Sequence, residues 1–410
     1  MRGILRAFWN FLAKRFVRAL LAPVMLAGLL TGLETASASA ATCVSWSGTP
    51  AASPGTSGNV LAATTALSPC DAWAVGWNSS GGPNQTLIEH WDGGSWTVQA
   101  SPDPGAGANV LNGVRATSPT NAWAVGTFSN GAGVDQTLIL HWNGTKWTQV
   151  ASPNPGNTAS LSAIDAVSAS DAWAVGQYAI IAAGAPARAD ATGRDAAART
   201  ATTGSHTLVL HWNGCTWKQV ASPTPAGGGG LTGVTATSAS SAWAVGGFNG
   251  SDGIRNVILH WNGTVWTRQA SPAPGTASSL SAADAMSAAN AWAVGFLIKG
   301  GAIQTLTLHW NGRKWAQVPS PNVGASANSL NGVAAVSASS ARAVGSYTTP
   351  GGDNTLVLRW DGTRWGQVPS PTPGGTEAGL NGVTASSTSN FWAVGFFSGG
   401  TEEALTLHCC

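Results

Sequence analysis

The chain has 410 residues, of which only 9% are charged, and it is rich in Gly and Trp, with 53 and 21 residues. So low a charge excludes a disordered coil of the highly charged kind. The formal net charge is +2, but removal of residues 1–40 takes away five basic residues and leaves −2. A surface of this balance has no electrostatic reason to bind nucleic acid, and we expect no nucleic-acid partner.

Residues 1–40 have the pattern of an export signal. Basic residues in 1–18 precede the apolar stretch 19–33, which is short for a membrane span, and the small residues 36–40 offer two A-x-A cleavage sites. Retention as an N-terminal anchor is the alternative, whereas a lipid anchor on Cys43 is disfavoured by the preceding Thr42. We expect a secreted protein, free or at the cell surface, with no membrane contact once the signal is removed. Its five cysteines then meet an oxidising compartment.

A repeat of about 50 residues organises the rest of the chain. The second copy reads L-N-G-V-R-A-T-S-P-T-N-A-W-A-V-G, a variable stretch, and then Q-T-L-I-L-H-W-N-G-T-K-W-T-Q-V-A-S-P-N-P-G. Repeats of this length over a whole chain indicate a repeat architecture. The copies begin at Leu61, Leu111, Leu161, Leu231, Leu280, Leu330 and Leu380.

Each copy predicts four short strands, a to d. In the second copy these cover residues 111–118, 122–128, 137–142 and 146–150. The Asn143-Gly144 pair between strands c and d is a strong hairpin signal, and the prolines that follow strand d end the pairing. Four antiparallel strands per repeat indicate one propeller blade. The third blade carries an insertion over residues 179–205, interpreted as a flexible flap over one face or as a disordered loop.

The last copy lacks its outer strand, because the chain stops at Cys409-Cys410. The start of the repeat region supplies a candidate, since Trp46 aligns without a gap with the d-strand tryptophans of the other copies. We therefore predict an all-β, seven-bladed β-propeller over residues 41–410, a single domain whose last blade is closed by an N-terminal strand within residues 42–47.

This alignment brings Cys43 next to the two terminal cysteines. We expect a disulfide between Cys43 and either Cys409 or Cys410, the choice being open from spacing alone. Cys70 is a possible partner for the remaining terminal cysteine, and Cys215 is expected to stay unpaired.

The repeat resembles secreted bacterial propellers of the kelch and Asp-box kind, such as those of sialidases and galactose oxidase. The W-N-G-x-x-W hairpin is similar to the Asp box S-x-D-x-G-x-T-W, but Asn143 and Trp147 are four residues apart where the Asp box has five. The kelch double glycine is not part of the repeat. The resemblance therefore implies the architecture and no activity.

The repeated aromatic residues favour structural roles. Of the 20 tryptophans after residue 40, 19 occupy three repeat positions in strands b, c and d, and Trp77 is the exception. Their burial is enough to explain them as packing between blades. One histidine stands at the same c-strand position in six copies, before Trp in five and before Cys409 in the last, with Arg359 in the remaining copy, which favours a repeated structural hydrogen bond.

Three charged residues on strand a face the expected central channel. Arg115 and Asp165 lie in adjacent blades and are expected to form an ion pair, and Asp284 shares their repeat position. A channel ligand or cation site is the alternative, although two carboxylates are too few to indicate Ca²⁺. We expect no metal and no cofactor.

The face that carries the b–c loops is the candidate binding surface, because these loops vary on a repeated scaffold. Aromatic residues end strand b beside the loops, and capping of each blade is their alternative role. No nucleophile, acid pair or phosphate loop indicates catalytic residues. We expect a monomeric extracellular binding or scaffolding protein with a protein partner, the alternatives being a glycan-binding propeller and, with less support, a carbohydrate-active hydrolase or lyase. The aromatic residues are Trp77, Phe128, Tyr178, Phe248, Phe296, Tyr347 and Phe397.

Overall fold

A computed structural model describes Cys43 and residues 45–180, 204–374 and 376–410. These belong to the second of two compact units, Ala40–Cys410. The described residues form strands and turns without a helix, so the all-β prediction is confirmed for them. None of them belongs to a helix that could cross a membrane. The predicted export signal and residues 181–203 of the predicted insertion lie outside the described residues.

The strands are arranged in antiparallel groups of four, which we call blades and name after their inner strand. Four blades are separate sheets. The β6 blade contains β6 (Asn109–Ser118), β7 (Asn121–Ser129), β8 (Asp135–Trp142) and β9 (Trp147–Gln149). The β10 blade contains β10 (Thr158–Ser168), β11 (Asp171–Ala179), β12 (Ser205–Trp212) and β13 (Trp217–Gln219). The β14 blade contains β14 (Gly229–Ser238), β15 (Ser241–Gly250), β16 (Gly253–Trp261) and β17 (Trp266–Arg268), and the β18 blade contains β18 (Ala277–Ser287), β19 (Asn290–Lys299), β20 (Ala302–Trp310) and β21 (Trp315–Gln317).

The other three blades are joined in a twelve-stranded sheet by two single parallel pairings, Asp353 with Glu377 and Gly58 with Glu402. The β2 blade contains β2 (Gly58–Ser68), β3 (Asp71–Ser79), β4 (Gln85–Trp91) and β5 (Trp96–Val98). The β22 blade contains β22 (Asn328–Ser337), β23 (Ser340–Thr349), β24 (Gly352–Trp360) and β25 (Trp365–Val368). The β26 blade contains β26 (Glu377–Ser387), β27 (Asn390–Ser398), β28 (Glu402–Cys409) and, as its outer strand, β1 (Ser47–Thr49).

The outer strand of the β26 blade comes from the other end of the chain, as predicted, but it is shorter and begins later than residues 42–47. Ser47 pairs with His408, whereas in the β6 blade the ladder already begins with the Trp142–Trp147 pair. In the β26 blade the position of this third-strand Trp is taken by Cys409, which is bonded to Cys43. The ladder therefore starts one residue after Trp46.

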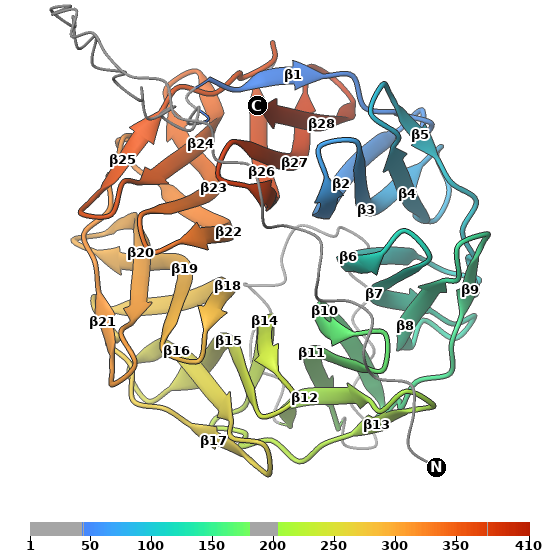
Figure 1. Cartoon of the computed structure of the whole chain (residues 1–410), viewed down its shortest axis with the longest axis horizontal. Coiled ribbons are helices and arrows are strands. Elements are labelled where there is room, and N and C mark those ends of the chain that lie inside the picture. Colours follow the sequence, from blue (N-terminus) through green and yellow to red (C-terminus); the bar gives the residue numbers. More distant parts are fainter. Residues whose placement is uncertain (1–42, 44, 181–203, 375) are drawn as a thin grey trace, which may run out of the picture. The chain divides into compact units, whose positions relative to one another are not determined.

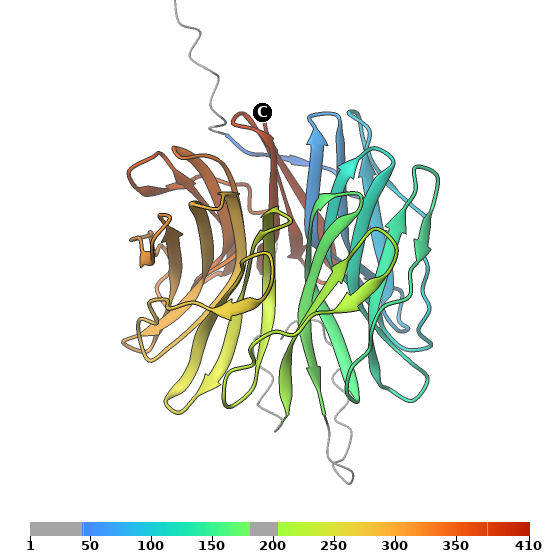
Figure 2. The same cartoon turned by 60° about the horizontal axis from the view of Figure 1, so that its bottom comes forward.

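The blades surround a central axis, with their inner strands at the centre and their outer strands at the rim (Figure 1). Figure 2 shows that the strands run between the two faces of this ring. Tryptophans fill the junctions between blades: the Trp123 ring lies 4.9 Å from that of Trp212 and 5.3 Å from that of Trp217, both in the next blade. Aromatic pairs of this geometry contribute about 0.5–1.5 kcal/mol each beyond area burial. The same triad occurs with Trp73, Trp173, Trp243, Trp292 and Trp392.

Side chains also join the last blade to the first. Trp392 and Val394 of the β26 blade share a buried cluster with Leu61 of the β2 blade. The Nδ2 group of Asn381 donates a hydrogen bond of 2.9 Å to the carbonyl oxygen of Leu61. These contacts repeat those between neighbouring blades elsewhere, such as Asn112 with Leu161. Packing rather than strand pairing thus connects most blades around the ring.

Two local features explain parts of the repeat. A Cβ on Gly126 of the A-W-A-V-G motif would overlap the carbonyl oxygen of Val110 on the neighbouring strand, so only glycine fits there. The c–d hairpin forms where Asn143-Gly144 predicts it, but its loop has four residues because Trp142 pairs with Trp147. The Asn143 side-chain oxygen accepts backbone N–H groups within the loop, and Gly144 adopts a φ of 90°.

Candidate functional site

The candidate face carries the b–c hairpins and also the linkers that lead from each outer strand to the next inner strand. Since strands alternate in direction, both kinds of segment lie at the same end of every blade. The hairpins differ while the strand pairings repeat: Gly250 pairs with Gly253 across two residues, whereas β3 and β4 are separated by residues 80–84. Variable loops on a constant scaffold are where binding residues concentrate.

The aromatic residues that end strand b fall into two sets rather than one. Trp77 and Phe296 directly follow the glycine of the A-W-A-V-G motif, whereas the other five follow it by two residues. The two sets therefore point to opposite sides of strand b. The five members of the larger set are half-buried against the hydrophobic clusters at the blade junctions, which is the capping role. They are Phe128, Tyr178, Phe248, Tyr347 and Phe397.

A set of three polar residues joins strand c to the following linker in five blades, and we call it the clasp. In the β6 blade the Thr137 and Ser152 hydroxyls are 2.6 Å apart, and the Thr137 N–H donates to the Asn154 side-chain oxygen at 2.6 Å. The residues are visible in the sequence as a Thr near the start of strand c and an S-P-x linker, but sequence reasoning did not connect them. The other clasps are Thr86–Ser101–Asp103, Thr207–Ser222–Thr224, Thr305–Ser320–Asn322 and Thr355–Ser370–Thr372.

The clasp is incomplete in the β14 blade, and a hollow lies there. Ala273 occupies its third position, and its methyl group cannot accept the backbone N–H of Asn256. Asn256 replaces the threonine and donates its Nδ2 group to the Ser271 hydroxyl at 3.0 Å. The hollow measures about 440 Å³ and is lined by these residues together with Phe248, Arg255, Arg268, Gln269 and Ala270. We call it the β14 hollow.

Two arginines make the β14 hollow positively charged. Arg255 donates to the Thr276 carbonyl oxygen at 2.8 Å and lies 3.4 Å from the carboxylate of Asp252. Arg268 is exposed, and its guanidinium carbon lies 4.4 Å from the centre of the Phe248 ring. No described residue forms an ion pair with Arg268. The hollow thus presents one arginine with only an aromatic partner.

The clasp is incomplete again in the β26 blade. Ala404 and Ala51 replace its threonine and serine, and Ser53 accepts the backbone N–H of Ala404 at 3.1 Å. A hollow of about 360 Å³ lies at this place, with Phe397 and Glu403 in its lining. We call it the β26 hollow; it is equivalent in position to the β14 hollow but carries a carboxylate instead of arginines.

The charged residues of the central channel tie neighbouring blades together. Arg115 and Asp165 form the expected ion pair at 2.9 Å, and the second Asp165 oxygen accepts the Ala236 N–H at 2.7 Å. Asp284 accepts the Ala335 N–H at 2.7 Å. Burial raises the pKa of Asp284 to about 6, and the Asp165 carboxylate acts in the same direction. Threonines make the equivalent interblade bond at Thr65 and Thr235, so these contacts belong to the scaffold.

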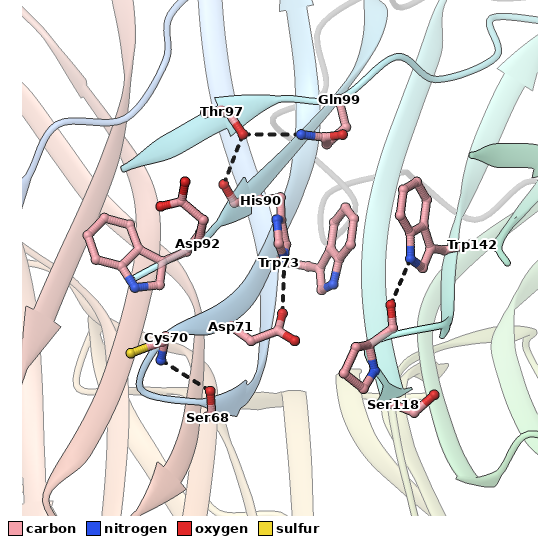
Figure 3. A network of polar contacts seen from close by, with 12 residues as sticks. Ser68, Cys70, Asp71, Trp73, His90, Asp92, Thr97, Gln99, Ser118 and Trp142 are labelled. Carbon is pink, nitrogen blue, oxygen red and sulfur yellow. Dashed lines mark hydrogen bonds and ion pairs between the residues drawn. The ribbon is translucent and has the colours of Figure 1, made fainter. Parts of the chain in front are cut away.

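The histidines are structural in the way the repeat indicates. His90 Nε2 lies 2.9 Å from the Asp71 carboxylate, and its ring lies 4.3 Å from that of Trp73 (Figure 3). The Trp142 indole from the next blade stands close by and donates to a backbone carbonyl oxygen. The same pairing of a histidine with Asp or Asn recurs at His141, His211, His309 and His408. His260 of the β14 blade is the exception: Ser241 stands at the position of the Asp or Asn, and His260 Nε2 has no hydrogen-bond partner among the described residues.

The structure joins Cys43 and Cys409 in a disulfide, with their Cα atoms 5.4 Å apart. Both cysteines are buried in the cluster that also contains Trp46. Cys70, Cys215 and Cys410 are free and exposed, so Cys70 does not take the second terminal cysteine.

Arg342 holds the segment around Cys43 in place, and sequence reasoning missed it. It is 1% exposed and stands where the other b strands have tryptophan. Its Nη2 group donates to the Cys43 carbonyl oxygen at 2.6 Å, and its guanidinium lies 4.7 Å from the Phe391 ring centre. Burial, together with the nearby Arg359, lowers its pKa to about 10. The change of A-W-A-V-G to A-R-A-V-G was its only signal in the sequence.

Glu89 is a second residue that sequence reasoning missed. It is fully buried at a c-strand position where the other blades have leucine. Its Oε2 atom accepts the backbone N–H of Ala52 at 3.0 Å, while Oε1 has no hydrogen-bond partner among the described residues. Burial raises its pKa to about 7.

Nothing in the described ranges groups three or more His, Cys, Asp or Glu residues in a way that could hold a metal ion.

Comparison with known proteins identifies the fold alone. No family model and no curated protein matches the chain. Among solved structures, YCF48 from Cyanidioschyzon merolae is 16% identical with a TM-score of 0.51, over 89% of this chain and 98% of that one. YCF48 bound to D1 peptide is 14% identical with a TM-score of 0.50, over 89% and 95%. The polysaccharide lyase PL25, an ulvan lyase bound to -[GlcA(1-4)Rha3S]-, is 9% identical with a TM-score of 0.53, over 85% and 94%. The chain is a β-propeller.

Proposed function

We propose that this chain is an exported, non-catalytic binding module, a monomeric closed ring of seven blades that holds a protein partner on the face carrying the b–c hairpins. The observation that carries the proposal is the loss of the clasp in the β14 and β26 blades. Each loss leaves a hollow on this face beside an aromatic ring, Phe248 or Phe397. Since the clasp stabilises five blades, its replacement by alanines costs contacts and gives space for a ligand.

The lining of the two hollows supports binding rather than catalysis. Neither contains a histidine, cysteine or aspartate, and the β26 hollow holds a single carboxylate, that of Glu403. General acid–base or nucleophilic chemistry requires paired groups within hydrogen-bond reach.

Glycan binding is the second candidate, favoured by the aromatic ring in each hollow. The structural neighbours are divided on this point, since one YCF48 structure holds a peptide and the ulvan lyase holds a saccharide. A shared fold does not choose between these ligands. A carbohydrate-active enzyme is a third candidate, which the absence of an acid pair from the described hollows disfavours.

The test uses the purified chain as bait for the extracellular fraction of the producing cells, with a glycan array in parallel. The matched control is the triple variant A273N/A51S/A404T, which gives the three alanine positions the polar residues of the intact clasp and leaves Asn256 in place. We expect a discrete protein that the natural chain retains and the control releases, identified by mass spectrometry. The proposal is wrong if the natural chain binds glycans on the array and captures no protein. It is also wrong if the triple variant retains the captured protein as well as the natural chain does.

A further inference from the structure

We propose that the β14 hollow binds a carboxylate side chain of an acidic peptide segment, between Arg255 and Arg268 and beside the Phe248 ring. This inference rests on the proposed function, because it names the chemistry by which the protein partner is recognised.

The hollow exists because one side chain is small. In the β6 blade the equivalent of Ala273 is Asn154, whose oxygen occupies this space and accepts the N–H of Thr137. In the β14 blade Asn256 and Ser271 keep the rest of the clasp in place, held at 3.0 Å, and Ser278 donates to Asn256 from behind. The walls are therefore fixed by scaffold contacts, and a ligand group can enter without rearranging the blade.

The two arginines of the β14 hollow are specific to this blade, because the other blades have no arginine or lysine at these repeat positions. The residues that correspond to Arg255 and Arg268 in the other blades are uncharged or acidic, apart from His206 in the β10 blade. A pair of arginines placed by two different strands at one hollow is thus a local departure from the repeat. The corresponding residues are Gln136 and Gln149, His206 and Gln219, Gln304 and Gln317, Asn354 and Gln367, Gln85 and Val98, and Glu403 and Gly48.

The geometry suits a carboxylate. The guanidinium of Arg268 lies over the Phe248 ring, and stacking of this kind leaves the in-plane N–H donors available for a planar anion. Arg255 already lies near one carboxylate, that of Asp252, at 3.4 Å and with the Asp252 side chain 73% exposed. A better-placed carboxylate from a ligand would replace this weak pair with charge-assisted hydrogen bonds.

The negative charge of the β26 hollow favours a protein ligand over an acidic polysaccharide. The β26 hollow is equivalent in position but presents Glu403. The β14 and β26 blades lie on opposite sides of the ring (Figure 1). An anionic polysaccharide that crossed this face would meet repulsion at Glu403, whereas a protein surface carries charges of both signs and can complement both hollows.

The experiment measures the fluorescence anisotropy of a labelled ten-residue peptide of alternating Asp, Glu and Leu, capped at both ends, with the purified exported chain. Three variants probe the site: R255Q and R268Q, which use the glutamine found at these positions in other blades, and A273N, which fills the hollow and leaves both arginines. R313Q, on a c–d hairpin at the other face, removes the same charge and is the control.

We expect the dissociation constant to rise at least tenfold in R255Q, R268Q and A273N, to stay within twofold in R313Q, and to rise when the peptide carries Asn and Gln in place of Asp and Glu. Equal binding by A273N, or equal loss in R313Q, would overturn the site, since it would show a diffuse charge effect. Stronger binding of oligoglucuronate than of the peptide at the same hollow would overturn the peptide class. A protein captured by the natural chain and held equally by R255Q and R268Q would refute this inference while leaving the proposed function intact.

Discussion

Glu89 is a buried carboxyl group that makes one hydrogen bond and leaves one oxygen without a partner among the described residues. Its carboxyl group replaces a leucine in a fully buried position and satisfies the Ala52 N–H. Burial favours the neutral form of a carboxyl group over the carboxylate, which is why the pKa of Glu89 rises to about 7.

The free energy of unfolding is therefore expected to fall as the pH rises from about 4.5 to 7. In this range the folded chain retains the Glu89 proton while the unfolded chain, with an ordinary pKa of 4.5, has lost it. The full effect is about 3 kcal/mol. Glu89→Gln keeps an acceptor for Ala52 and removes the titration, so we expect the variant to be more stable than the natural chain at pH 8 and similar to it at pH 4.5. Urea unfolding at both pH values measures this.

Glu403→Gln is the control, because it removes one carboxylate from a half-buried position in the neighbouring β26 blade. If Glu89→Gln and Glu403→Gln change stability at pH 8 by the same small amount, burial of Glu89 has no energetic consequence and the prediction is wrong.

At the scale of single residues the sequence predicts roles wherever the repeat is regular. The tryptophans and histidines recur at fixed positions in most blades, and the structure gives most of them the packing and hydrogen bonds expected of recurring residues. Arg342 and Glu89 break the repeat, and the break is visible in the sequence, but its meaning is not. The partners of these two residues, Cys43 and Ala52, are distant in the chain and come together only after the ring has formed.

Among the outer strands of the blades, β1 is the one that no c–d hairpin joins to its partner strand. It has three paired residues, Ser47, Gly48 and Thr49, and is supported by the Cys43–Cys409 disulfide and by Arg342. Since the two cysteines are 366 residues apart in the sequence, the loop-entropy model gives the disulfide a contribution of about 6 kcal/mol, whereas disulfides contribute no more than about 5 kcal/mol in practice.

The variant C43S/C409S is therefore expected to lose up to about 5 kcal/mol of unfolding free energy, with β1 and β28 opening first. Chemical unfolding gives the magnitude and hydrogen exchange gives the order. A reducing agent should reproduce the loss in the natural chain and have no further effect on the variant. Uniform exchange across all blades after reduction would contradict the prediction that β1 and β28 open first.

The insertion between β11 and β12 is expected to contribute little to the stability of the fold. Ala179 and Ser205 are paired directly, and Ile180 donates to the Gly204 carbonyl oxygen at 3.2 Å, so the two ends of the insertion already meet. Replacement of residues 182–201 by a short Gly/Ser link should leave the melting temperature within about 3 °C, because loop length has only a weak entropic effect. A large drop measured by calorimetry would show that the insertion packs as part of the core.

The strands and their order can be predicted from the alternation of apolar and polar residues and from the turn residues, but the bounds of β1 cannot. They depend on the disulfide at Cys409, which shifts the start of the ladder. The β14 and β26 hollows could not be predicted from the sequence for a related reason. Each depends on an alanine, Ala273 or Ala404, and a small residue becomes informative only when the larger side chain that it replaces is known to fill space.

The whole molecule depends on closing the β26 blade, and a circular permutant tests whether the disulfide serves this purpose. Joining residue 410 to residue 43, with C409S, C43G and C410N, recreates the four-residue c–d hairpin of the other blades, and new ends fit between residues 190 and 191 of the insertion. We expect this permutant to fold and its β1 strand to exchange as slowly as other outer strands, with or without reductant. The linear C43S/C409S chain is the matched comparison; fast exchange of β1 in both would show that the peptide link cannot replace the disulfide.

The sharing of the β26 blade between both ends of the chain also bears on how the protein is made. The ribosome delivers β1 first and its partner β28 last, and at 5–20 residues per second the 366 residues between the two cysteines take roughly 20–70 seconds. Through this interval the early segment has no strand to pair with. A segment of only three residues, with exposed Ser47 and Gly48, offers little for a neighbouring nascent chain to pair with while it waits.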